Sequence, residues 1–388
     1  MERVVVVRAL RTPIGKFFGG LSTLSAADMG TAVVQALVEG LDLTVDEVIF
    51  GCARQAGQGP NPARQIAIRA GLGDGTAAHT INMACGSGLK AIALGAEAIR
   101  LGRARAVVAG GVESMSQVPF YLKRMRTGHR LGHAPLVDGM YDDGFDCRIA
   151  DQVMGLTAET LADQYEIDRD EQDRFALASQ QKAAKAIAEG AFDAEIVPVT
   201  ANDREKTRVD ADEHPRPETT LEKMAKLPPV FRKDGTVHAG NSSGITDGAA
   251  ATLLVPESLA QKKGWEPLAV FEDWAGAGVD AKVMGIAPVP ATRALLARTR
   301  SKLDGFDLIE LNEAFAAQVL ACERELKYDP ARLNVHGGAI ALGHPIGCTG
   351  TRIVVTLLHA MRRRKAKRGL ATLCISGGQG LAASFTAP

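Results

Sequence analysis

The sequence predicts an α/β fold built from two similar halves, with a separate segment inserted into the first half. Three observations predict this fold. Strands alternate with helices in the first and last thirds of the chain, the order of the elements repeats, and a long polar stretch interrupts the first copy. Alternation of this kind favours a mostly parallel sheet with helices on its faces.

The first third of the chain begins this pattern. Its first predicted helix, residues 25–40, opens with Ser25, which is a candidate N-cap. Strands are predicted at residues 3–10, 45–53, 79–84 and 104–111, and further helices at residues 62–72 and 88–102.

The last third repeats the pattern. Strands are predicted at residues 267–278, 306–311, 371–378 and 381–386, and helices at residues 289–299, 314–326 and 350–361. Residues 87–111 and 349–378 are the most similar parts, because each runs from a Gly-containing helix start to a strand that ends in Gly-Gly. This alignment places Cys374 opposite Val107.

The repeat also locates the insertion. In the second half "GGQG" leads directly into a final strand, whereas "GGVES" in the first half meets its partner strand only near residue 250. We therefore expect residues 1–115 with 247–265 to form one half, residues 116–246 an inserted loop domain, and residues 266–388 the other half. The insertion contains one clear helix, residues 169–190, and a polar loop, residues 201–226.

The composition excludes several functional classes. Lys plus Arg and Asp plus Glu both number 45, so no overall charge favours nucleic acid or a membrane surface. No stretch is long enough for a membrane span, and the apolar run at the N-terminus is too short for a signal peptide. Six Cys without CxxC pairs suggest neither a disulfide framework nor a zinc site, so we expect a reduced cytoplasmic compartment.

Cys85, in "NMACGSGLK", is the first candidate for chemistry. It lies where a predicted strand gives way to a helix, and free helix-terminal amides there would stabilise a thiolate or an oxyanion. The glycines beside it indicate that something comes close to the backbone. The alternative is a buried structural cysteine.

Asn312, His344 and Cys374 are the other candidates. Ligands gather at the carboxyl ends of strands in an open α/β sheet, and Cys85 and Asn312 both follow such ends. His344 lies in an irregular turn, and Cys374 lies inside a strand. Structural alternatives remain open, because Asn312 is also a candidate helix cap, His344 a satisfied polar residue and Cys374 a core residue.

Together these segments resemble a thiolase, and the resemblance covers essentially the whole chain. It rests on "NMACGSGLKA", "NEAFA", "GGAIALGHPIGCTG" and "LCISGGQG", supported by "GNSSGITDGAAA" and "RTPIGKF". It implies a five-layered αβαβα fold of two similar halves with a loop domain inserted in the first.

The resemblance also implies roles for the candidates. Cys85 would carry the acyl group, His344 would activate it, and Cys374 would move the proton at the substrate α-carbon. Asn312 would hold a water in the oxyanion hole for the enolate, which His344 also lines. The backbone amides of Cys85 and Ser376 would form a second hole around the thioester oxygen, although many members have Gly at the position of Ser376.

Contacts with coenzyme A (CoA) are implied in the same way. Ser243 would lie beside the pantetheine arm and Arg216 would pack on the adenine. Further positions of the substrate pocket are Phe145, Val153, Met154, Ala239 and Met284. No metal and no tightly bound cofactor are expected, since CoA thioesters are substrates and products.

The implied reaction converts two acetyl-CoA into acetoacetyl-CoA and CoA, by an acyl-enzyme and a Claisen condensation. Val153 stands where many acetoacetyl-CoA-specific members have His, so a broader 3-ketoacyl-CoA thiolase is the alternative. Ketoacyl synthases share the fold but would not need Cys374, and a non-catalytic acyl-CoA-binding protein would not need the four candidates. The resemblance further implies a homo-oligomer, a dimer or more specifically a tetramer.

Overall fold

A mixed ten-stranded sheet runs through both halves of the computed structural model, which describes residues 2–201 and 204–388. The strands follow the order β14-β15-β16-β13-β1-β12-β5-β3-β4, and the short β2 pairs with β12. Their bounds are β1 (Val4–Arg11), β2 (Gly15–Lys16), β3 (Glu47–Gly51), β4 (Ala77–Ile81), β5 (Val107–Ser114), β12 (Thr246–Pro256), β13 (Ala269–Gly278), β14 (Leu308–Leu311), β15 (Arg368–Ile375) and β16 (Gln379–Thr386).

The prediction of a mostly parallel sheet is wrong. β3 pairs in parallel with β4 and β5, and β14 with β15, but every pairing of β1, β12, β13 and β16 is antiparallel. The reason is local in the second half. Gly377 and Gly378, with φ of 85° and 83°, turn the chain directly from β15 into β16, and strands joined by so short a turn run antiparallel.

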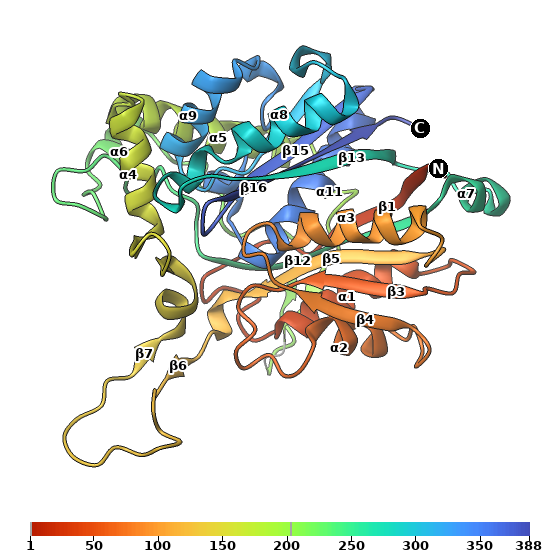
Figure 1. Ribbon diagram of the computed structural model, residues 1–388, viewed down its shortest axis with the longest axis horizontal. Helices are drawn as coiled ribbons and strands as arrows, with labels where there is room; N and C mark the ends of the chain where they lie inside the picture. Colours follow the sequence, from red (N-terminus) through yellow and green to blue (C-terminus); the bar gives the residue numbers. More distant parts are fainter. Residues whose placement is uncertain (1, 202–203) are drawn as a thin grey trace.

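Helices cover the outer face of each half and also fill the space between the halves. On the outer face of the first half, α1 and α2 pack on β1, β3, β5 and β12. On the outer face of the second half, α8 and α9 pack on β13 to β16. Between the halves, α3 and α11 share a hydrophobic cluster with strands of both. Figure 1 shows these elements as five layers, which confirms the predicted αβαβα arrangement. The bounds are α1 (Ala26–Val38), α2 (Pro62–Arg69), α3 (Ser87–Arg100), α7 (Glu257–Lys263), α8 (Pro288–Thr299), α9 (Ala316–Leu326), α10 (Ala339–Leu342) and α11 (Ile346–Arg364).

The N-terminus of α1 has the predicted cap. Ser25 Oγ accepts the backbone N–H of Asp28 at 3.1 Å, and the Asp28 carboxylate accepts the backbone N–H of Ser25 at 3.0 Å. This reciprocal pair is a capping box, and it satisfies two donors at the helix start.

The two halves repeat each other in a register that differs from the predicted one. β5 pairs with β12 so that Glu113 faces Gly248, and β15 pairs with β16 so that Cys374 faces Gly380. The counterpart of Cys374 is therefore Glu113, and the alignment with Val107 is wrong. The two Gly-Gly pairs mislead the alignment because the first lies inside β5 and the second in the turn after β15.

The expected insertion lies between two neighbouring strands. Ser114, at the end of β5, pairs with Asp247 near the start of β12, so the ends of the 116–246 segment meet in the sheet. This proximity supports the division that we propose: residues 1–115 with 247–265, residues 116–246, and residues 266–388.

The inserted segment contains more helix than predicted. The predicted helix forms as α5, but α4 also forms, and its buried face includes Gly155, Thr157 and Glu159, which give little apolar spacing. Residues 201–226 are mostly loop as predicted, and 202–203 lie outside the described residues. The elements are β6 (Phe120–Tyr121), β7 (Val137–Asp138), β8 (Asp146–Cys147), β9 (Gln152–Val153), α4 (Met154–Gln164), α5 (Arg169–Ala188), β10 (Val199–Thr200), β11 (Arg208–Val209) and α6 (Leu221–Ala225).

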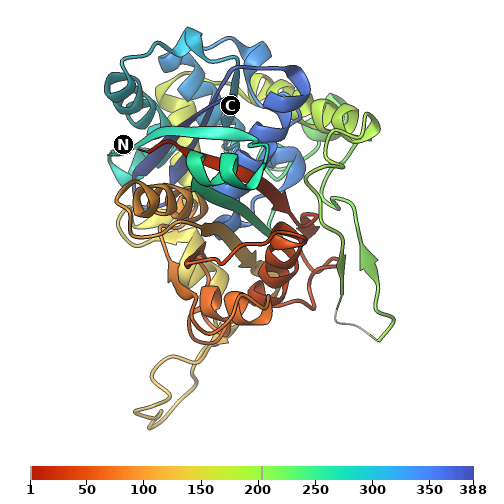
Figure 2. The ribbon, with the colours of Figure 1, turned by 90° about the vertical axis from the view of Figure 1, so that its right-hand side faces the viewer.

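One part of the inserted segment stands away from the body of the molecule. The hairpin of β6 and β7 carries a long loop that protrudes in both ribbon views (Figures 1 and 2). Within the described residues, the helices are all too short or too polar to cross a bilayer.

A buried ion-pair network ties the inserted segment to the first half. Arg11 is fully buried in β1, and its guanidinium donates to Glu195 at 2.6 Å and to Asp212 at 2.7 and 2.9 Å. Both carboxylates belong to the inserted segment. Arg11 therefore holds this segment against the sheet.

We expect Arg11→Met to lower the free energy of unfolding by about 3–5 kcal/mol, because two buried carboxylates lose their partner. The midpoint of urea unfolding measures this loss. Arg69→Met is the matched control, since the Arg69–Asp28 ion pair is half-exposed and is worth roughly 1 kcal/mol or less. Equal midpoints for the two variants would contradict the role of Arg11.

Candidate active site

A cavity of about 520 Å³ brings most of the predicted site residues together. Side chains from both halves and from the inserted segment line it. They are Cys85, His344, Cys374, Ser376, Phe145, Val153, Met154, Arg216, Ala239, Ser243 and Met284. Asn312 is the one predicted residue that does not line it.

Cys85 lies in the tight turn between β4 and α3. Ala84 just before it has a φ of 44°, and Ser87 Oγ holds the turn by donating to the Ala84 carbonyl at 2.6 Å. The glycines have a structural reason, because a Cβ at Gly86 would collide with Ile375 and one at Gly88 with Thr351. The protein's own core makes the close approach that the sequence indicates.

His344 is in direct contact with the Cys85 sulfur. Its Nε2 lies 3.3 Å from Cys85 Sγ, and its Nδ1 lies 2.6 Å from Thr349 Oγ1. The Thr349 hydroxyl donates to the Pro345 carbonyl at 3.0 Å, so it accepts from Nδ1–H. Nε2 is then the unprotonated nitrogen, which is the form that can accept the thiol proton.

Burial and charge control the protonation of this pair. Burial lowers the pKa of His344 to about 3, with further lowering by the positive charges of Arg352 and Arg54. Burial raises the pKa of Cys85, whereas the Arg54 charge and backbone N–H groups of Ser376 and Cys85 lower it. His344 is therefore neutral near pH 7, and the two amides already interact with the sulfur.

Cys374 lies beside this pair. It is 1% exposed in β15 and packs with Met284 and Ala314. Burial raises its pKa well above the ordinary value, and the nearby Cys85 raises it further. The resting thiol of Cys374 is therefore neutral.

Asn312 follows β14 and is buried, with 1% of its surface exposed. Both polar atoms of its side chain lack a hydrogen-bond partner among the described residues. It does not cap the next helix, because the N-cap of α9 is Phe315. The capping alternative is therefore wrong, and the buried amide needs an acceptor and a donor from elsewhere.

Two family models match nearly the whole chain. The thiolase N-terminal domain matches residues 4–258, and the thiolase C-terminal domain matches residues 265–387. The chain belongs to the thiolase family.

Among similar proteins, the acetyl-CoA acetyltransferases of Pseudomonas aeruginosa and Escherichia coli are 55% and 50% identical to this thiolase, and each alignment covers 98% of both chains. The crystal structure of the Bacillus anthracis acetyl-CoA acetyltransferase has a TM-score of 0.98 at 46% identity, covering 100% of this chain and 99% of that one. Human mitochondrial 3-ketoacyl-CoA thiolase in complex with CoA has a TM-score of 0.96 at 41% identity, covering 100% and 98%.

Sequence reasoning missed three residues of this thiolase site. Thr349 fixes the His344 tautomer, and its signal is a hydroxyl five residues after the His. His214 lines the cavity with its Nδ1 2.8 Å from the Ala341 carbonyl, and it stands two residues before Arg216. Arg54 also lines the cavity, and its signal is a charged residue three positions after the end of β3.

The site contains no arrangement typical of a metal centre. Among residues 2–201 and 204–388, no three or more His, Cys, Asp or Glu side chains cluster in a way that could hold a metal ion.

Proposed function

We propose that this thiolase is an acetyl-CoA acetyltransferase, which converts two acetyl-CoA into acetoacetyl-CoA and CoA and also catalyses the reverse thiolysis. The observation that carries this proposal is the contact of 3.3 Å between His344 Nε2 and Cys85 Sγ, beside a second buried cysteine in one cavity. The names of the similar bacterial proteins support the acetyl-CoA substrate.

In the first half-reaction His344 takes the thiol proton, and the Cys85 thiolate attacks the acetyl-CoA carbonyl. The backbone N–H groups of Cys85 and Ser376 stabilise the oxyanion that forms, because both already face the sulfur. CoA leaves with a proton, and the acetyl group stays on Cys85 as a thioester.

In the second half-reaction the Cys374 thiol gives its proton to His344 Nε2, and the resulting Cys374 thiolate takes an α-proton from another acetyl-CoA. The enolate attacks the acyl-enzyme, and the released Cys85 thiolate takes the proton back from His344. The enolate oxygen is stabilised by His344 Nε2–H and by a water that Asn312 holds. The unpartnered amide of Asn312 supports this role, since a buried amide without a protein partner is a binding place for water.

CoA binds as a substrate and not as a resident cofactor. Ser243 contacts the pantetheine arm and Arg216 the adenine, and Phe145, Ala239, Met154 and Met284 complete the walls of the cavity that they line. No metal takes part. The protein works as a homo-oligomer, either a dimer or a tetramer. It works in the reducing cytoplasm, and the free state of all six cysteines supports this compartment.

Activity across chain lengths tests the proposal. We expect acetoacetyl-CoA to form from acetyl-CoA alone, and acetoacetyl-CoA to be cleaved faster than longer 3-ketoacyl-CoA substrates. Absorbance of the 3-ketoacyl thioester enolate follows both directions. An enzyme that cleaves only the longer substrates would overturn the proposal.

Val153 is expected to set the upper limit of chain length. Its apolar side chain lines the cavity just before α4, so the wild type should retain measurable thiolysis of 3-ketohexanoyl-CoA. Val153→His should narrow the range towards acetoacetyl-CoA, because a larger polar side chain fills the space. A wild type with no activity on the six-carbon substrate would contradict this expectation.

A further inference from the structure

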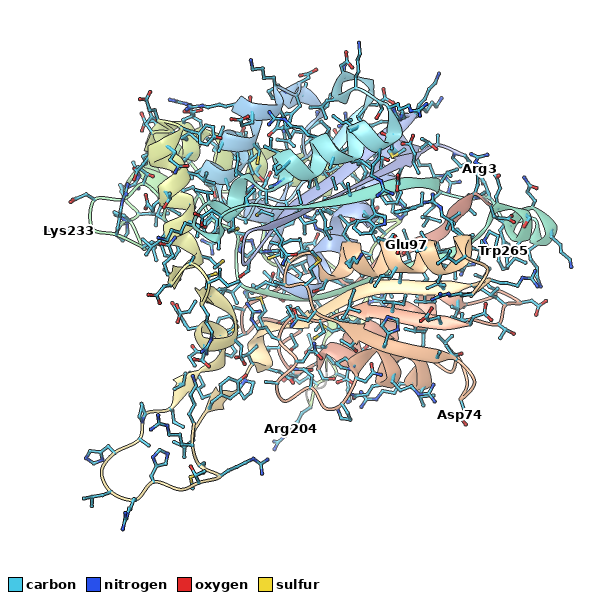
Figure 3. All side chains as sticks on the ribbon, in the orientation of Figure 1. Arg3, Asp74, Glu97, Arg204, Lys233 and Trp265 are labelled. Carbon is cyan, nitrogen blue, oxygen red and sulfur yellow. The ribbon has the colours of Figure 1, made fainter. Side chains whose placement is uncertain are left out.

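Arg54 is a buried cation in the cavity that contains Cys85. It is 6% exposed, its Nε has no hydrogen-bond partner, and its guanidinium has no carboxylate within 4.0 Å among the described residues. By contrast, the long side chains of Arg204 and Lys233 extend into solvent (Figure 3). Burying an arginine without a partner is costly, so an anion bound from outside the protein would stabilise it.

Glu113 is a buried acid that interacts electrostatically with Arg54, but it does not form an ion pair with the guanidinium. Glu113 compensates the charge of Arg54 at a distance, but its carboxylate accepts the backbone N–H groups of Ala53, Arg54 and Gly347 at 3.1, 2.9 and 2.8 Å. The guanidinium instead lies against Gly144, where any Cβ would collide with it. Its position is therefore fixed while its donors remain available.

Arg54 lines the same cavity as Cys85, the residue proposed to carry the acyl group. Cys85 packs against a cluster that includes Ala53 and Met115, and Arg54 follows Ala53 directly in the chain. The Arg54 charge also acts on the protonation of Cys85, lowering the pKa of the thiol. The proposed contacts with the pantetheine arm and the adenine, Ser243 and Arg216, come from a different segment of the chain.

We propose that Arg54 binds a carboxylate at the end of the acyl chain, so that Cys85 also accepts acyl groups such as succinyl from a CoA thioester. This inference rests on the proposed function, since it assigns a further acyl class to the same nucleophile. A guanidinium with free donors is opposite in charge to a carboxylate and can form a bidentate hydrogen-bonded pair with it.

The chemical step is the same as for acetyl. The Cys85 thiolate attacks the thioester carbonyl, a new carbon–sulfur bond forms, and the bond to the CoA sulfur breaks. CoA leaves as a thiolate that takes the proton held on His344. The distal carboxylate does not react, and no oxidant or other reactant is needed.

The test compares succinyl-CoA with butyryl-CoA, which have equal chain lengths and differ in a terminal carboxylate or methyl. Rapid-quench mass spectrometry of the Cys85 peptide gives the acylation rate for each. We expect Arg54→Met to lower the succinyl-to-butyryl rate ratio roughly 10- to 100-fold, the typical range for losing one charged hydrogen-bond partner. Arg54→Lys keeps the charge and should give an intermediate ratio.

The succinyl-to-butyryl rate ratio distinguishes two roles of Arg54: binding the carboxylate of the acyl chain, and activating the Cys85 thiol. If Arg54 acts only on the Cys85 thiolate, both rates fall together and the ratio stays constant, which overturns the proposal. Lys16→Met is the matched control, because Lys16 also lines the cavity but is exposed. The succinyl-to-butyryl rate ratio of this variant should differ from that of the wild type by less than twofold. An equal effect in both variants would overturn the assignment to Arg54, as would a wild type that succinyl-CoA does not acylate.

Acetyl-CoA in the same experiment separates this proposal from the proposed function. A wild type that acetyl-CoA fails to acylate at Cys85 contradicts the proposed function itself. Normal acetylation together with a ratio that is insensitive to Arg54 overturns only the carboxylate site. If Arg54→Met does not fold, Arg54→Lys against wild type gives the same comparison.

Discussion

Cys85→Ala is expected to abolish acyl-enzyme formation and to lower the condensation rate by roughly 10⁴-fold or more, as loss of a covalent nucleophile does. Cys85 carries the sulfur that contacts His344 at 3.3 Å, and backbone amides surround the same atom. Removing the sulfur leaves the cavity but no atom that can hold the acetyl group. Incubation with radiolabelled acetyl-CoA followed by denaturation measures the covalent label.

Cys147→Ala is the matched control for this variant. Cys147 is also buried, but it packs on Ala150 and Ala281 and does not line the cavity. The Cys147→Ala protein should therefore take up the same amount of covalent acetyl label as the wild type. Covalent label on the Cys85→Ala protein would show that another residue is the nucleophile. Near-equal thermal unfolding midpoints of the two variants would confirm that the loss is chemical and not structural.

The predictable part of the fold lay in local patterns. The strands of both halves, α3, α5 and the Ser25 cap follow from periodicity and capping residues, which depend on neighbours in the chain. Strand direction did not follow, because β12 returns to β5 after the long insertion and its partner lies far away in sequence. The alignment of Cys374 with Val107 was wrong for a related reason. One Gly-Gly pair lies inside a strand in the first half, and the other lies in a turn in the second half.

The predictable part of the site lay in the motifs. Cys85, His344 and Cys374 converge in one cavity as the resemblance to a thiolase implies. The supporting residues did not follow, because their roles depend on three-dimensional contacts. Thr349 acts through a hydrogen bond of 2.6 Å to the His344 ring, and Arg54 matters because it is buried without a partner. The sequence shows a hydroxyl and a charge at these positions, but it shows neither the hydrogen bond nor the burial.

The electrostatics of the two cysteines suggests an order for the half-reactions. Burial raises the pKa of Cys374 well above the ordinary value, and the neighbouring Cys85 raises it further. A Cys85 thiolate therefore opposes ionisation of Cys374. Acetylation of Cys85 removes that negative charge, so Cys374 becomes easier to ionise at the stage when its base is needed.

Cys374→Ser should separate the two half-reactions. Transthioesterification at Cys85 needs no α-proton transfer, so acetyl-CoA should still acylate this variant, although more slowly. Condensation and exchange of the acetyl-CoA α-protons with heavy water should fall by roughly 10²–10⁴-fold, the typical loss for one proton-transfer group. A serine hydroxyl is far less acidic than a thiol, so it cannot supply a comparable base near neutral pH. NMR follows the exchange, and mass spectrometry of the Cys85 peptide follows acylation in the same sample. If the variant exchanges α-protons at the wild-type rate, the base is another residue, and His344 is the first to test because its neutral Nε2 faces the same space.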